Sequence, residues 1–258
     1  MSTIQFAFLI TILTALFIVF GTFIGINIKT KNTKFLSLIL GFAGGIMLYL
    51  AFLEILPESL EILQSKFGDD KGRLVSIISF FSGIFLISLL DKIIPDFTDM
   101  SEEEKKLPFS CLYRVGVFSA LTIGIHNIPE GFSTFMAAMK SESLGISMGL
   151  AIGIHNITVG LAIGIPIFLA TKSKTKALFF STLSSSLTIL GGGIAYYFIG
   201  SILDDSLFGV VFSLIAGMMV FIALDEILPT AEKYGDHHLV IYGIIGGMLL
   251  TAVSMIIH

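Results

Sequence analysis

Residues 121–131 read LTIGIHNIPEG and residues 151–160 read AIGIHNITVG, so the motif GIHNI occurs at 124–128 and again at 153–157. Both copies lie inside long apolar stretches, where a polar group without a hydrogen-bond partner is expensive, on the order of 2–7 kcal/mol. The first copy continues with Pro129 and Glu130, whereas the second has Thr158 and Val159 at the equivalent positions. The repeat therefore predicts a polar site to which two helices contribute unequally.

The composition indicates a protein that lies mostly in lipid. Hydrophobic residues make up 55% of the chain and charged residues 13%, and the mean hydropathy is +0.96, whereas soluble domains carry roughly 25% charged residues. A membrane helix needs about 20 apolar residues. We predict an all-α polytopic membrane protein with one transmembrane domain, 1–258, and eight helices near 4–26, 36–56, 74–94, 114–139, 144–170, 175–200, 207–231 and 238–257.

The distribution of basic residues predicts the orientation of these helices. Eleven of the fifteen Lys and Arg residues fall in the odd-numbered loops, and loops rich in Lys and Arg stay in the cytoplasm. Both termini should then lie outside. The acidic segment 95–110 becomes a cytoplasmic loop, which either gathers cations weakly or is a solvated linker. A net charge of −4 gives no reason to expect a nucleic-acid partner.

A second repeat relates two other predicted helices. Residues 45–59, GIMLYLAFLEILPES, and residues 217–231, GMMVFIALDEILPTA, are identical at seven of fifteen positions, including Glu54 and Glu226 and the Leu-Pro pair that follows each. These stretches belong to the second and seventh helices, which would cross the membrane in opposite directions, as would the two GIHNI helices. Inverted repeats of this kind are common in secondary transporters, whose substrate sites lie near the membrane midplane.

The spacing of polar residues predicts the site itself. His126 and Glu130 are four residues apart and share one helix face, and Pro129 between them should kink the helix because it has no N–H to donate. Small residues let helices approach closely. We therefore expect the fourth and fifth helices to pack together and to bring His155 opposite His126, through Gly124, Gly131, Gly153 and Gly160.

The side chains so gathered favour a transition-metal cation. Imidazole, carboxylate and amide groups suit Zn²⁺, Fe²⁺, Co²⁺ or Mn²⁺, whereas Ca²⁺ and Mg²⁺ prefer oxygen ligands alone. The alternative interpretation is that these residues are buried polar groups that hydrogen-bond between helices. His237 and His238, which follow Asp236, form either a further metal site in the last cytoplasmic loop or an ordinary interfacial loop.

These motifs resemble those of the ZIP family of divalent metal transporters, in particular its bacterial ZupT/GufA-like branch. The resemblance rests on HNIPEG in the fourth helix, the second His-Asn pair in the fifth and LDEILP in the seventh. It implies helices in a 3+2+3 arrangement, location in a bacterial inner or plasma membrane, and alternating access that carries metal toward the cytoplasm. The implied metal ligands are His126, Asn127, Glu130, His155 and Asn156.

The resemblance also implies a pathway on either side of that site. The family's inner exit ligands fall on Asp225 and Glu226, and Glu54, the inverted counterpart of Glu226, would lie near the outer mouth. Family members with a paired-metal centre carry two further Glu residues, at positions that Val159 and Thr188 occupy in this chain. We therefore predict a single metal ion in the transport site.

The expected partners are the lipid bilayer and a transported Zn²⁺ or another divalent cation. We expect no resident cofactor. The sequence leaves open whether the chain forms a homodimer. Two other functions fit part of the pattern. One is a degenerate relative that binds metal as a sensor or partner without transport. The other is an intramembrane metallo-hydrolase, which would need a general base beyond the metal ligands.

Overall fold

The computed structural model describes residues 1–27, 33–93, 124, 127–199 and 205–256. These residues are helical throughout, apart from short turns. The elements are α1 (Thr3–Asn27), α2 (Thr33–Tyr49), η1 (Leu50–Ile55), α3 (Leu56–Phe67), α4 (Asp69–Ile93), α6 (Glu142–Thr171), α7 (Lys174–Ile199), α8 (Asp205–Ile222), η3 (Ala223–Ile227), α9 (Leu228–Tyr234) and α10 (His237–Ile256). A further helix, called here the 127–140 helix, precedes α6.

The surface of the helices is strongly apolar. Seven helical segments within the described ranges are long and apolar enough to cross a membrane. Large side chains such as Phe85, Tyr197 and Phe81 are 71%, 71% and 61% exposed, which is favourable only where lipid replaces water. The chain is therefore a multi-pass membrane protein. Of the predicted helix at 114–139, the part before residue 127 lies outside the described residues except for Gly124, and so does the acidic segment 95–110.

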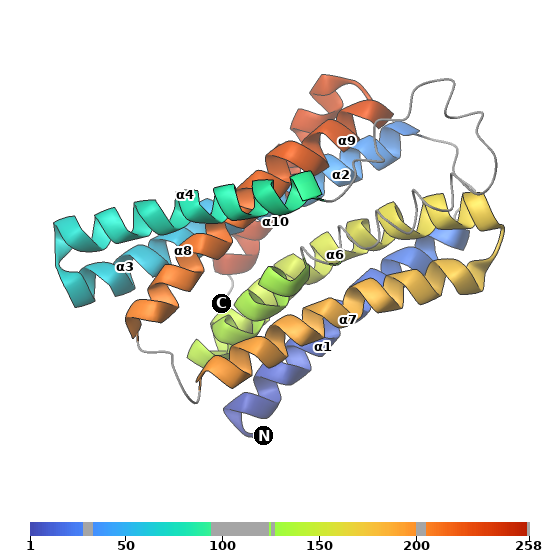
Figure 1. The fold of residues 1–258 in the computed structure, drawn as a ribbon. Helices are drawn as coiled ribbons and strands as arrows, with labels where there is room; N and C mark the ends of the chain where they lie inside the picture. The colour runs from blue at the N-terminus through green and yellow to red at the C-terminus, as the bar shows by residue number, and fades with distance from the viewer. Residues whose placement is uncertain (28–32, 94–123, 125–126, 200–204, 257–258) are drawn as a thin grey trace.

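The helices form two groups that lie side by side (Figure 1). In one group α1, α6 and α7 contact one another, and the 127–140 helix joins them where Phe135 meets Phe8 of α1 and Tyr196 of α7. In the other group α2 packs against α10, and α4 packs against α3 and α8. Contacts between α2 and α6 and an ion pair between Lys140 and Glu58 of α3 link the two groups.

Two glycines set equivalent close contacts in the first group. A Cβ atom on Gly131 would lie 1.8 Å from the carbonyl oxygen of Thr188 in α7, and one on Gly160 would lie 2.0 Å from the carbonyl oxygen of Ile18 in α1. Gly131 and Gly160 are equivalent positions of the two GIHNI repeats. The repeat therefore extends beyond the motif, because the 127–140 helix meets α7 as α6 meets α1.

These contacts correct the sequence-based expectation for the glycines. Gly124 and Gly131 pack against α7, and Gly153 and Gly160 pack against α1. The expectation that these four residues bring the two GIHNI helices directly together is wrong. Small residues indicate that a helix is approached closely, but they do not say which partner approaches it.

The helices with the second repeat continue through their prolines. Pro57 and Pro229 cannot donate to the carbonyl four residues earlier, and each follows a π-helical segment, η1 or η3. The N–H of Leu56 instead bonds the carbonyl of Ala51, and the N–H of Leu228 bonds that of Ala223. The helix that was expected to end near residue 56 thus runs on to Phe67 as α3. Such π-bulges often mark functional positions.

Substitution of Gly160 tests the close contact between α6 and α1. We expect Gly160→Ala to destabilise the protein by about 1–3 kcal/mol, because the added methyl group would force the two backbones apart. Gly193→Ala is the matched control, since a Cβ atom at Gly193 meets no atom within 4 Å. Unfolding of the two variants in detergent measures the difference. Equal stability of both variants would contradict the packing described above.

Candidate metal site

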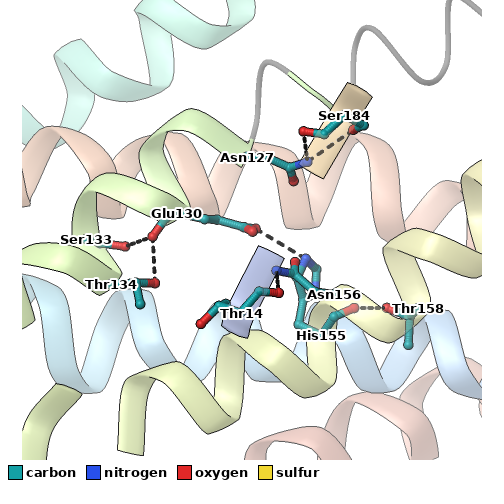
Figure 2. A network of polar contacts seen from close by, with 9 residues as sticks. All are labelled: Thr14, Asn127, Glu130, Ser133, Thr134, His155, Asn156, Thr158 and Ser184. Atoms are coloured by element: carbon teal, nitrogen blue, oxygen red, sulfur yellow. Dashed lines mark hydrogen bonds and ion pairs between the residues drawn. The ribbon is translucent and has the colours of Figure 1, made fainter. Parts of the chain in front are cut away.

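A carboxyl group and an imidazole face each other between the 127–140 helix and α6 (Figure 2). The Nε2 atom of His155 lies 3.3 Å from Oε1 of Glu130, and each side chain is only 3% exposed. The two helices are antiparallel neighbours, because a single residue, Ser141, separates them and caps α6 by accepting from the N–H of Leu144. This hairpin brings together the two halves of the GIHNI repeat.

Several buried polar atoms around this pair have no hydrogen-bond partner in the described part of the chain. They include Oε2 of Glu130, Nδ1 of His155 and Oδ1 of Asn156. A buried polar atom without a partner costs about 1–3 kcal/mol, so such atoms are uncommon unless a ligand, a water molecule or an ion meets them. Carboxylate and amide oxygens and imidazole nitrogens are atom types that divalent transition metals accept as ligands.

The two asparagines turn their amide nitrogens toward neighbouring helices (Figure 2). Nδ2 of Asn127 donates to the carbonyl oxygen and to the hydroxyl oxygen of Ser184 in α7, both at 3.1 Å. Nδ2 of Asn156 donates to the carbonyl oxygen of Thr14 in α1 at 3.0 Å. Each asparagine thus ties its helix to an outer helix through its amide nitrogen, and the amide oxygen of Asn156 has no hydrogen-bond partner among the described residues.

Nearby hydroxyl groups bond the main chain of the facing pair. Ser133 and Thr134 both donate to the carbonyl oxygen of Glu130, at 3.0 and 2.7 Å, and Thr158 donates to that of His155 at 2.6 Å. All three residues are buried. These bonds satisfy side-chain hydroxyl groups inside an apolar bundle and keep them from competing for the facing pair.

Val159 and Thr188, which stand where paired-metal family members have Glu, lie in different surroundings. Val159 packs at the edge of an apolar cluster that includes Ile18 and Ile163. Thr188 is fully buried, and its hydroxyl oxygen has no hydrogen-bond partner among the described residues.

The residues that the structure describes contain no group of three or more His, Cys, Asp or Glu side chains that could together hold a metal ion. His126 lies outside the described residues, so its pairing with Glu130 remains a prediction.

The predicted pathway carboxylates lie in the two π-helical segments. Glu54 is in η1, and Asp225 and Glu226 are in η3. Asp225 is exposed, whereas Glu54 and Glu226 are partly buried. The extra residue in a π turn changes the direction in which nearby side chains point, so each π-helical segment affects where its carboxylate points.

His237 and His238 have no common hydrogen-bond partner among the described residues. Nδ1 of His237 lies 2.7 Å from Oε1 of Glu232, and the ring of His238 is 6.1 Å from that of His237 between centroids. Asp236 instead caps α10, because its Oδ1 accepts from the N–H of Leu239. The side chains of His237 and His238 are exposed, and both residues lie in the first turn of α10 and not in the preceding loop, where the sequence placed them.

Sequence reasoning did not single out Ser184 or Thr14, although both contact the candidate site. The available signal was the run of three serines at 184–186 within an apolar helix. Such a run is common in membrane helices, where hydroxyl groups bond their own main chain. Only the packing of α7 against the 127–140 helix distinguishes Ser184 from its neighbours.

Comparisons with known proteins cover nearly the whole chain. A family model described as ZIP zinc transporter matches residues 2–110 and 96–255. The zinc transporter ZupT of Chlorobium chlorochromatii is 44% identical over 98% of this chain and 98% of its own length. The proteins of that name from Chlorobaculum parvum and Streptococcus mutans are 43% and 42% identical, over 99% and 97% of this chain and 98% and 97% of their own lengths.

The contact between Glu130 and His155 should stabilise the metal-free protein. We expect His155→Leu to lower the free energy of unfolding by about 1–3 kcal/mol, because it leaves the carboxyl group of Glu130 buried without the imidazole that faces it. The double variant Glu130→Leu/His155→Leu should recover most of that loss, since it removes both polar groups. Denaturant unfolding in the presence of a chelator measures both. A double variant less stable than His155→Leu would show that the pair is not coupled in this way.

Proposed function

This chain belongs to the ZIP family of zinc transporters, and we propose that it carries a divalent transition-metal cation, zinc in the first place, across the membrane into the cytoplasm. The observation that carries this proposal is the buried pair of Glu130 and His155. Both side chains and that of Asn156 have a buried polar atom without a hydrogen-bond partner among the described residues. Buried ionisable groups in membrane helices commonly mark a substrate pathway. Membership of a transporter family speaks against the metallo-hydrolase.

In this proposal the cation binds between the 127–140 helix and α6. Glu130 and His155 are its principal ligands, Asn127 and Asn156 offer amide oxygens, and His126 is the fifth ligand that the resemblance implies. Metal binding takes the carboxyl group as carboxylate and the imidazole in its neutral form. These ligands then bring one negative charge to a divalent cation. The remaining positive charge favours a weakly held ion, as a carrier that must release its substrate requires.

We propose that one ion binds at a time. A second ion would need further anionic ligands, and the repeat offers Val159 where the first copy has Glu130. Val159 packs against an apolar cluster, and its own side chain has no oxygen or nitrogen to offer as a ligand. A hydroxyl group, as on Thr188, brings no negative charge.

The remaining features fit a transporter that works by alternating access. The placement of both termini outside agrees with the excess of Lys and Arg in the odd-numbered loops, and the 3+2+3 arrangement is the one that the family resemblance implies. Glu54 would then lie on the outer side of the site, and Asp225 and Glu226 on the inner side. The proposed location is a bacterial plasma membrane. The exposed His237 and Glu232 pair would meet the cation only after release.

The second candidate function is metal binding without transport, as a sensor or a partner protein. Val159 and Thr188 favour it, because these two positions lack the carboxylates of the paired-metal centre. Uptake measurements separate the two functions, since a sensor would bind radioactive zinc without moving it into vesicles.

Transport of ⁶⁵Zn²⁺ into proteoliposomes tests the proposed site. We expect Glu130→Gln and His155→Ala each to lower uptake by at least about tenfold, because each removes a metal ligand. Glu142→Gln is the matched control, since Glu142 is an exposed carboxylate in the first turn of α6 and should leave uptake within about twofold. Unchanged uptake in both variants would contradict the assignment of Glu130 and His155 as metal ligands. If the parent protein itself showed no uptake, the result would favour metal binding without transport.

The number of bound ions is a separate prediction. We expect titration calorimetry of the purified protein to give about one Zn²⁺ per chain in the membrane site, with the signal lost in Glu130→Gln. Anomalous scattering from a zinc-soaked crystal locates the ion. Two fully occupied ions between the 127–140 helix and α6 would contradict the single-ion proposal.

A further inference from the structure

Ser184 in α7 contacts the proposed site without being one of its ligands. We propose that Ser184 is a positioning residue for the transported cation, because it holds the amide of Asn127 with its oxygen, and not its nitrogen, turned to the metal. The inference rests on the proposed function, which makes Asn127 a ligand. It adds a residue on a third helix to a site built from the 127–140 helix and α6.

The hydrogen bonds determine which end of the amide faces α7. The amide nitrogen of Asn127 has two N–H donors and lies 3.1 Å from each of two acceptors, the carbonyl oxygen and the hydroxyl oxygen of Ser184. A carbonyl oxygen can only accept. Turning the amide over would therefore set the oxygen of Asn127 against a second oxygen. Both residues are almost fully buried, at 1% and 2% exposed, so water cannot easily relieve that contact.

The second copy of the repeat uses the same arrangement with one bond fewer. Asn156 donates to the carbonyl oxygen of Thr14 in α1 at 3.0 Å, and its own Oδ1 is buried without a hydrogen-bond partner among the described residues. The hydroxyl group of Thr14 instead donates to Ile10 of its own helix at 2.7 Å. A main-chain carbonyl thus orients each asparagine, and the Ser184 hydroxyl adds a second acceptor on the Asn127 side alone.

This orientation matters because the two ends of an amide interact oppositely with a cation. The oxygen is a ligand, whereas the NH₂ group carries partial positive charge and repels a metal ion. Without the hydroxyl acceptor one N–H of Asn127 would be free to seek other partners, and the oxygen would be less often in place. Loss of the Ser184 hydroxyl should therefore weaken binding of the cation. It should not slow the conformational change that carries the bound cation across the membrane.

Uptake kinetics of Ser184 variants test the inference. We expect Ser184→Ala and Ser184→Cys both to raise the KM for ⁶⁵Zn²⁺ about two- to tenfold, which is the range for one lost hydrogen bond, with the maximal rate unchanged. The cysteine variant fills the volume that alanine leaves empty. The matched control is Ser185→Ala, because Ser185 is buried in the same helix and donates to Thr182 of its own helix at 2.9 Å. Its KM should stay within about twofold.

A double-mutant cycle separates this role from a general effect on packing. We expect Asn127→Ala to raise the KM and Ser184→Ala to add nothing in the Asn127→Ala background. Additive effects, or a fall in the maximal rate with unchanged KM, would overturn the positioning role while leaving the ligand assignment intact. An unchanged KM in Asn127→Ala itself would overturn both, because Asn127 would then not bind the cation.

Discussion

Glu130 and His155, buried 3.3 Å apart between two antiparallel helices, are the contact around which the other features of this protein are arranged. An ionisable residue at the centre of a membrane helix costs roughly 2.5–3.5 kcal/mol on insertion scales, and two of them in contact are retained for a function. The surrounding polar residues follow from this pair, because each must either serve the cation or bond a neighbouring helix. Asn127 and Asn156 do both in the proposed site.

Close backbone contacts hold that pair in place. The 127–140 helix rests against α7 at Gly131, and α6 rests against α1 at Gly160, in contacts that any larger side chain would prevent. The same two interfaces carry the hydrogen bonds of Asn127 and Asn156 to the main chain of the outer helices. Each outer helix therefore supports one half of the repeat and fixes the orientation of one amide. Sequence similarity between the halves thus corresponds to similarity of their supports.

The unequal halves of the repeat explain how a transporter of this family could work with few charges at its site. One half supplies a carboxylate at Glu130, and the other half has Val159 within an apolar cluster. A cation held by one carboxylate, imidazole nitrogen and amide oxygens depends more on the orientation of neutral ligands than one held by several carboxylates. The ties from Ser184 and Thr14 to the two asparagines address that need.

The sequence alone determined that the chain is helical and lies in a membrane, because hydropathy and the positions of charged residues are properties of composition and order. It also singled out His126, Asn127, Glu130, His155 and Asn156 as candidate ligands, since polar side chains repeated within apolar stretches are visible without coordinates. Only the tertiary structure decided which helices the glycines pack against and that Ser184 and not Ser185 reaches Asn127, because these depend on rotation and partner choice between helices. The continuation of the helix through Pro57 was likewise decided by a π-bulge, whose widened turn absorbs the missing N–H and which no local pattern distinguishes from a helix end.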